Sequence, residues 1–259
     1  MSAEGNKLAK GSQVEQVFAQ LLNMVIDGTY PEKARLPAER ALCEELDTSR
    51  GTLREALRRM ADWGIIESRQ GSGMVVCLQK DWPFEVLPAY LRYSAGTMAP
   101  DQIMPMMKEL LALQTDVIVM AMRFAARQAK PENLGLAREM AQKSWDVRQD
   151  PHAFALAEFD FIRALIAAGD FLPAQWLMNR LGGIFLESSL SFVHLAPPMP
   201  EEYLTYMETL LTLVARNDED AAAKLVREQL SFMNGQVLTA LADFFNSTDY
   251  PTENRGDAQ

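Results

Sequence analysis

The spacing of apolar residues changes within the first third of the chain, and this change constrains the fold more than any other feature. Residues 14–26 place apolar side chains at i, i+3, i+4, i+7, i+8, i+11 and i+12, which indicates a helix with one buried face. Two further helical patterns cover residues 38–46 and 50–63. The pattern then becomes that of two short strands, at residues 65–68 and 74–77.

Turn and cap residues lie between these patterns. Pro37 suits the first turn of the second helix, where its missing N–H has no intrahelical partner. Residues 47–49, Asp-Thr-Ser, break the chain and cap the third helix, and Gly64 is expected to end that helix in a left-handed conformation. Residues 70–73 form a glycine-rich hairpin turn. Three helices and a hairpin in this order predict a winged helix-turn-helix domain.

From residue 84 onward the pattern is helical almost to the end of the chain. We expect helices over residues 84–94, 100–129, 132–148, 152–168, 173–193, 200–216 and 218–245. Prolines punctuate the starts of most of them, and no strand-like alternation occurs after residue 80. The second domain is therefore expected to be an all-α bundle of about six or seven helices.

The fold class is accordingly mainly α, in two domains. We expect a winged helix-turn-helix over residues 1–80, a linker helix within 81–99, an all-helical effector-binding and dimerisation domain over 100–246, and a disordered tail over 247–259. Residues 1–10 are also polar without periodicity, and are expected to be disordered.

The net charge of −10 argues against a nucleic-acid binder when it is taken over the whole chain. Residues 1–80, however, hold 11 Lys and Arg against 11 Asp and Glu, so the whole acidic excess lies after residue 80. A cationic face on the neutral first domain can still bind phosphate, and an acidic second domain disfavours non-specific contacts with DNA.

The third predicted helix is rich in arginine and begins with small polar residues. Ser49, Arg50, Gly51 and Thr52 lie at its N-terminus, and Arg54 follows one turn later. In helix-turn-helix proteins this end enters the major groove, where arginine can form two hydrogen bonds to guanine. Gly51 leaves room for a close approach to DNA. For the arginines taken alone, a solvated helix face is the alternative.

The predicted hairpin tip has its own possible role. Arg69 and Gln70 flank a Gly-Ser-Gly turn that can lie against a phosphate or in the minor groove. A plain hairpin is the alternative for the turn alone. Together with the two preceding helices, however, the turn and the arginines favour DNA binding.

Residues 36–76 resemble the N-terminal domain of the GntR family of bacterial repressors. The resemblance is carried by LPAER at 36–40, by the S-R-x-T-x-R-E-A-L run from Ser49, by G-I-I at 64–66 and by Q-G-x-G-x-x-V from Gln70. It implies operator contacts by Arg40, Arg50 and Arg54, phosphate or base contacts by Ser49 and Thr52, and minor-groove contacts by the wing at Gln70, Gly71 and Ser72. Ser49 stands where the family often has threonine, which keeps the hydroxyl.

Residues after 100 resemble the helical effector domain of the FadR subfamily, in helix number and in the runs 110–128, 157–170 and 207–229. Many members of that subfamily hold a metal with one aspartate and three histidines. The matching positions here are Glu158, Ile162, Met207 and Gln229. Two hydrophobic residues and one carboxylate among four ligand positions cannot hold a metal, so we expect no metal and no cofactor.

The metal-free branch of the subfamily includes fatty-acid regulators that bind long-chain acyl-CoA. The resemblance thus implies a fatty acyl-CoA or another acyl or carboxylate effector, and a non-lipid effector of carboxylate or sugar-acid catabolism is the alternative. The chain departs from the family at Gln114, where an arginine is usual. We expect effector contacts from Gln114, Arg123, Asp160 and Arg163, with the last three facing the interior of the bundle. A structural ion pair is the alternative for each of these three.

These features predict a homodimeric repressor that binds a palindromic operator in double-stranded DNA. An enzyme is the rival class, but the chain has only two histidines and shows no nucleophile–base arrangement and no glycine-rich phosphate loop. A binding module whose DNA-binding domain has lost its function is a third interpretation. Charged residues interrupt the most apolar stretch, 110–126, so we expect no membrane span and a cytoplasmic location.

Overall fold

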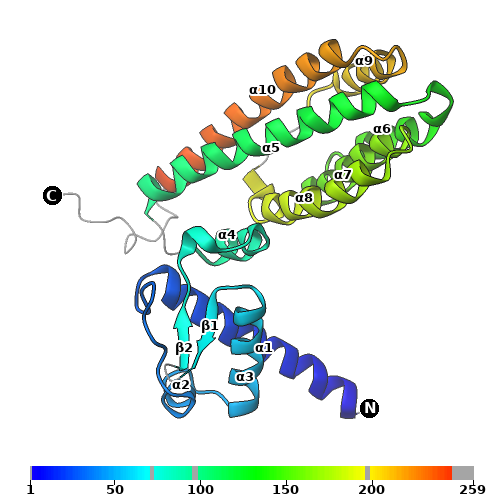
Figure 1. Ribbon diagram of the computed structural model, residues 1–259. Helices are drawn as coiled ribbons and strands as arrows, with labels where there is room; N and C mark the ends of the chain where they lie inside the picture. Colours follow the sequence, from blue (N-terminus) through cyan, green and yellow to red (C-terminus); the bar gives the residue numbers. More distant parts are fainter. Residues whose placement is uncertain (1, 71–72, 95–98, 196–198, 247–259) are drawn as a thin grey trace. The chain divides into compact units, whose positions relative to one another are not determined.

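The computed structural model describes residues 2–70, 73–94, 99–195 and 199–246 (Figure 1). The chain divides into two compact units, Met1–Met98 and Ala99–Gln259. Residues 81–98, most of the segment expected to link two domains, belong to the first unit. The tail predicted at 247–259 lies outside the described residues.

The first unit is a winged helix-turn-helix, as the sequence predicts. Its elements up to residue 76 are α1 (Ser2–Ile26), α2 (Glu39–Glu45), α3 (Arg50–Asp62), β1 (Ile66–Arg69) and β2 (Gly73–Val76). The two strands pair antiparallel with Ile66 opposite Val76. Helix α1 begins at Ser2, so the expectation that residues 1–10 are disordered is wrong for this helix.

A short third segment, residues 34–36, lies alongside β2 directly after a turn in which Lys33 has φ of 65°. Arg35 forms an isolated bridge with Val75, and the Leu36 N–H donates to the Met74 carbonyl at 2.9 Å. The sequence pattern does not predict this pairing, because the three residues before Pro37 are too few to show alternation. The pairing ties the wing to the segment that leads into α2.

The core of the first unit is built where α1 crosses α3. Phe18, Leu53 and Met60 are fully buried, and the Phe18 and Trp63 rings meet edge to face with centroids 5.2 Å apart. The helix expected at 84–94 is a 3₁₀ turn, η2 (Phe84–Val86), followed by α4 (Leu87–Ser94). Val86 and Ala89 from this segment join the same core.

The second unit is helical throughout its described residues, as predicted. It contains α5 (Pro100–Gln128), α6 (Gly135–Asp146), α7 (Pro151–Ala167), α8 (Leu172–Leu190), α9 (Tyr203–Ala215) and α10 (Glu219–Asn246). Helices α5 and α10 pack along each other, and α6 packs against α7 (Figure 1). No helix in the described ranges combines the length and the apolar character needed to cross a bilayer.

Small side chains let the helices of the second unit approach closely. Ala126, Ala137 and Ala222 are fully buried in its core. Where α7 meets α8, a Cβ added at Gly182 would lie 2.6 Å from the Phe159 ring, so a larger residue there would force neighbouring side chains to move. At the turn between α9 and α10, the side-chain amide of Asn217 donates to the Ala126 carbonyl at 2.8 Å and ties this turn to the end of α5.

Candidate nucleic-acid interface

The turn between α2 and α3 sets the start of the predicted recognition helix. Helix α2 ends at Glu45 with Leu46 as its C-cap, and Asp47 takes a left-handed conformation with φ of 44°. The Thr48 N–H then donates to the Cys43 carbonyl at 3.0 Å, which is the six-to-one hydrogen bond of a Schellman motif. Helix α3 ends in the same way: Gly64 has φ of 66°, as the sequence predicts, and the Ile65 N–H donates to the Met60 carbonyl.

Two hydroxyl groups cap the N-terminus of α3. The Ser49 Oγ accepts a hydrogen bond from the Thr52 N–H at 3.2 Å and lies 2.9 Å from the Thr52 Oγ1. Ser49 is exposed, whereas Thr52 is only 3% exposed. Ser49 is therefore open to a phosphate or base. The burial of Thr52 argues against the DNA contact expected for it and assigns its hydroxyl to the cap.

Gly51 lies in the first turn of α3 and is exposed. A Cβ built there would meet only the Ser49 Oγ, at 3.9 Å, which is ordinary van der Waals contact. Packing within the protein therefore does not require glycine at this position. The close approach of this turn to DNA stays a prediction.

Two of the three arginines expected to contact DNA form ion pairs with glutamates. The Arg54 Nε lies 2.9 Å from Glu39 of α2, and the Arg40 Nη1 lies 2.9 Å from Glu44 one turn along the same helix. These side chains are largely exposed, so each pair contributes about 0–1 kcal/mol to stability. The pairs can therefore exchange partners at little cost.

Arg50 differs from these arginines. It is exposed at the N-terminus of α3, and it has no ion pair or hydrogen bond with any residue that the structure describes. The positive end of the helix dipole lies at the same place and favours an anion there. Of the predicted DNA-contacting arginines, Arg50 is the one whose guanidinium is ready to bind a new partner.

Arg59, near the end of α3, packs against aromatic side chains of the domain core. Its guanidinium lies 4.3 Å from the centre of the Phe18 ring and 4.9 Å from that of Trp63. It also forms an ion pair with Glu15 of α1. This arginine therefore fixes α3 against α1 through cation–π contacts.

The wing is only partly described. Gln70, at the end of β1, is exposed, and the predicted contacts Gly71 and Ser72 lie outside the described residues. Gly73 has φ of 76°, and a Cβ there would lie 3.3 Å from the Arg35 Nε. Arg35 thus lies at the base of the wing. The sequence pattern does not indicate Arg35, because only the pairing of residues 34–36 with β2 brings it there.

The effector residues predicted in the second unit are not oriented as expected. The side chains of Arg123, Arg163 and Asp160 are 44%, 51% and 42% exposed, so the expectation that they face the bundle interior is wrong. Arg123 pairs with Asp220 across α5 and α10 at 2.6 Å. Gln114 is half-buried on α5. Asp160 and Arg163 line a surface pocket, and the effector role of all four stays a prediction.

The structure also places the four positions that were matched to metal ligands. Ile162 and Met207 pack with the apolar core, and Gln229 is half-buried. Glu158 accepts a hydrogen bond from the Tyr203 hydroxyl, and burial raises the pKa of its carboxyl to about 7. Within the described ranges, no three His, Cys, Asp or Glu side chains are grouped so that they could hold a metal ion.

The N-terminal residues that form the candidate nucleic-acid interface match a known protein family. Residues 13–76, from α1 to the end of β2, match the model of the family described as bacterial regulatory proteins, gntR family. The N-terminal domain belongs to the GntR family. The matched range contains α3, its N-terminal cap and the wing, which are the elements assigned to DNA from the sequence.

Similar proteins extend the likeness over most of the chain. The HTH-type transcriptional regulator Rv0494 of Mycobacterium tuberculosis is 28% identical over 89% of this chain and 90% of its own. The fatty acid metabolism regulator protein of Serratia proteamaculans is 25% identical over 80% and 83%. The structure of Lar, which controls the expression of the Listeria monocytogenes agr system, shares the fold, with 17% identity, coverage of 87% and 96%, and a TM-score of 0.52. The N-terminal domain is thus a GntR-family domain, and the similar proteins that extend over most of the chain are named as regulators.

Proposed function

We propose that this GntR-family regulator is a repressor that binds a palindromic operator as a homodimer and is controlled by a small-molecule effector. The observation that carries the DNA-binding part is Arg50, exposed and without an ion pair among the described residues at the N-terminus of α3. Two-fold symmetry of a dimer would place two such helices on two half-sites.

In this proposal the first turn of α3 enters the major groove. Arg50 donates two hydrogen bonds to the O6 and N7 of a guanine, and Ser49 donates to a phosphate. Arg54 and Arg40 leave Glu39 and Glu44 and bind phosphates instead. Because those ion pairs are exposed, the exchange costs little.

The test is selection of bound duplexes from a random DNA library, followed by footprinting of the full chain. We expect a palindromic site with two half-sites about one helical turn apart. Arg50→Ala should weaken operator binding by roughly 10- to 100-fold, since each base contact of this kind is worth about 1–3 kcal/mol. Arg58→Ala removes the same charge farther along α3, from an arginine paired with Glu55 at 2.6 Å, and is the matched control.

Equal affinity of wild type and Arg50→Ala for the selected site would remove the basis of the DNA-binding proposal. Recovery of no palindrome would contradict the dimeric mode alone. Loss of binding by both Arg50→Ala and Arg58→Ala to the same extent would indicate a general charge effect instead of base recognition.

The effector part of the proposal draws on the relatives. A similar protein is named a fatty acid metabolism regulator, which supports an acyl-CoA effector. A non-lipid carboxylate or sugar acid is the second candidate, favoured by the small pocket described below. Either ligand can act only by binding one conformation of the regulator more tightly than another.

Mass spectrometry of small molecules that co-purify with the native protein separates these candidates. An acyl-CoA in the protein fraction would support the lipid effector, and a small hydroxy or sugar acid would support the alternative. Because the relatives named as regulators extend over most of the chain, we also propose that the protein is not an enzyme and that it acts in the cytoplasm, where its DNA lies.

A further inference from the structure

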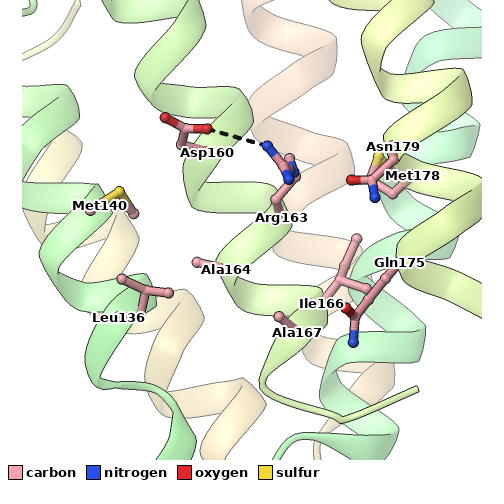
Figure 2. A pocket seen from close by; sticks show the side chains of 10 residues that line it. All are labelled: Leu136, Met140, Asp160, Arg163, Ala164, Ile166, Ala167, Gln175, Met178 and Asn179. Carbon is pink, nitrogen blue, oxygen red and sulfur yellow. Dashed lines mark ion pairs between the residues drawn. The ribbon is translucent and has the colours of Figure 1, made fainter. Parts of the chain in front are cut away.

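A pocket of about 260 Å³ opens on the surface of the second unit where α7 lies with α6 and α8 (Figure 2). Ala164 and Ala167, neighbours on one side of α7, contribute only methyl groups to it. Ile166 and Met178, both almost fully buried, complete its apolar part. The hollow therefore exists because small side chains occupy α7 at this point.

Charged groups stand at one side of this pocket. The Arg163 Nη1 lies 3.8 Å from the Asp160 carboxylate, and the Lys143 Nζ lies 3.8 Å from the same carboxylate. Both distances exceed that of a hydrogen bond, so the guanidinium keeps its donors available. Lys143 does not line the pocket, but its charge near Asp160 offsets that carboxylate and leaves the charge of Arg163 to attract an anion.

Two side-chain amides add neutral hydrogen-bonding groups from α8. Gln175 and Asn179 line the pocket (Figure 2). Neither amide forms a hydrogen bond with any of the residues that the structure describes. Each amide can both donate and accept, so it can bind a hydroxyl or a carbonyl beside the anionic group. The pocket thus combines one guanidinium, the Asp160 carboxylate, two amides and a small apolar floor.

We propose that this pocket binds a small carboxylate metabolite, with the carboxylate on Arg163 and a short body over Ala164 and Ala167. The volume lies below the roughly 300–1,000 Å³ of sites for drug-sized ligands, so an acyl-CoA does not fit. The pocket is distinct from the positions matched to metal ligands, since none of Glu158, Ile162, Met207 and Gln229 lines it. Carboxylate binding by this pocket is independent of the proposed function. The identification of that carboxylate as the effector rests on the proposed function.

The test measures ligand binding by the full chain without DNA, by thermal shift and isothermal titration calorimetry. The probes are L-lactate, butyrate and succinate, with lactamide and butyramide as uncharged counterparts. We expect at least one carboxylate to raise the Tm and the amides to leave it unchanged. Arg163→Gln should weaken that binding about tenfold or more, because it removes a charge-assisted pair of hydrogen bonds.

Two further variants sharpen the result. Ala167→Leu fills the pocket from an exposed helical position, so it should abolish binding while circular dichroism and Tm without ligand stay unchanged. Arg227→Gln is the matched control for charge and exposure, because Arg227 is 52% exposed and Arg163 is 51% exposed, and Arg227 lies outside the pocket, paired with Asp116 at 2.9 Å. It should bind the carboxylate like the wild type.

The proposal is overturned if no carboxylate probe binds, or if Arg163→Gln and Ala167→Leu bind as well as the wild type. A change of sedimentation coefficient in Ala167→Leu with no effect on ligand would instead make this pocket part of an interface between copies, which also contradicts it. Operator binding is measured separately with Arg50→Ala, so a failure of the pocket and a failure of the DNA-binding proposal are distinguishable.

Discussion

Ser49 has two roles at the residue scale, since it caps α3 and is expected to contact DNA. Ser49→Ala should lower the free energy of unfolding of the first unit by about 1 kcal/mol, because the Thr52 N–H loses its acceptor. Ser49→Thr keeps the acceptor and should be close to the wild type. Urea denaturation followed by circular dichroism measures both. An Ala variant as stable as the Thr variant would contradict the capping role.

Glu158 predicts a pH dependence of stability in the second unit. Its folded pKa of about 7 lies above the ordinary value of 4.5, so the folded state binds the proton more tightly than the unfolded state does. Stability from this group is therefore fully present below about pH 4.5 and is lost as the pH rises toward 7, by no more than roughly 3 kcal/mol.

Glu158→Gln should flatten this dependence between pH 5 and 7, since a neutral amide can still accept from the Tyr203 hydroxyl. Chemical denaturation at several pH values measures the effect. Asp160→Asn, which removes a 42% exposed acid two residues along α7, is the control and should leave the slope unchanged. A slope that persists in Glu158→Gln would assign the titration to another group.

Single residues differ in how well the sequence predicts them. Ser49, Arg50 and Gly64 could be placed because cap and helix-turn-helix patterns are local. Arg35 could not, since its place depends on a backbone pairing with β2 some forty residues away. The predicted inward orientation of Arg163 is wrong because α7 is apolar around much of its circumference, so the sequence does not show which face of this helix is buried.

At the scale of elements, α2 and α3 are joined by the pair between Glu39 and Arg54. Glu39→Gln should free this arginine and raise affinity for non-operator DNA several-fold, with a salt slope steeper by up to about one. Glu55→Gln changes the charge equally but frees Arg58, farther along the helix. Fluorescence anisotropy on a random duplex at several salt concentrations compares the two. An equal increase in affinity for both variants would mean that the net charge, and not the position of the freed arginine, determines binding to non-operator DNA.

Element boundaries were largely predictable. The second-unit helices begin and end within a few residues of the predicted ranges, because apolar periodicity and prolines mark them. The sequence pattern did not separate η2 from α4, since one 3₁₀ turn carries the same apolar spacing as a helix. The strand-like segment 34–36 could not be predicted, because it is short and pairs with residues about forty positions away.

At the scale of the whole molecule, the neutral first domain and the acidic remainder limit DNA binding to one local surface. In a dimer that uses two such surfaces, a palindrome should bind far more tightly than its half. We expect a duplex with one half-site replaced to bind at least 100-fold more weakly. Gel shift with both duplexes, and sedimentation of the complex, measure this. Equal affinities with one chain bound would contradict the dimer.

The glutamates that hold Arg40 and Arg54 act as counterions built into the protein. When an ordinary basic surface meets DNA, mobile salt ions are released into solution, and the affinity follows the salt concentration steeply. Here an arginine that reaches a phosphate leaves a glutamate behind, which then gathers a cation from solution and offsets part of that release. Occupancy of the operator should therefore follow the ionic strength of the cell less closely than the number of arginines suggests.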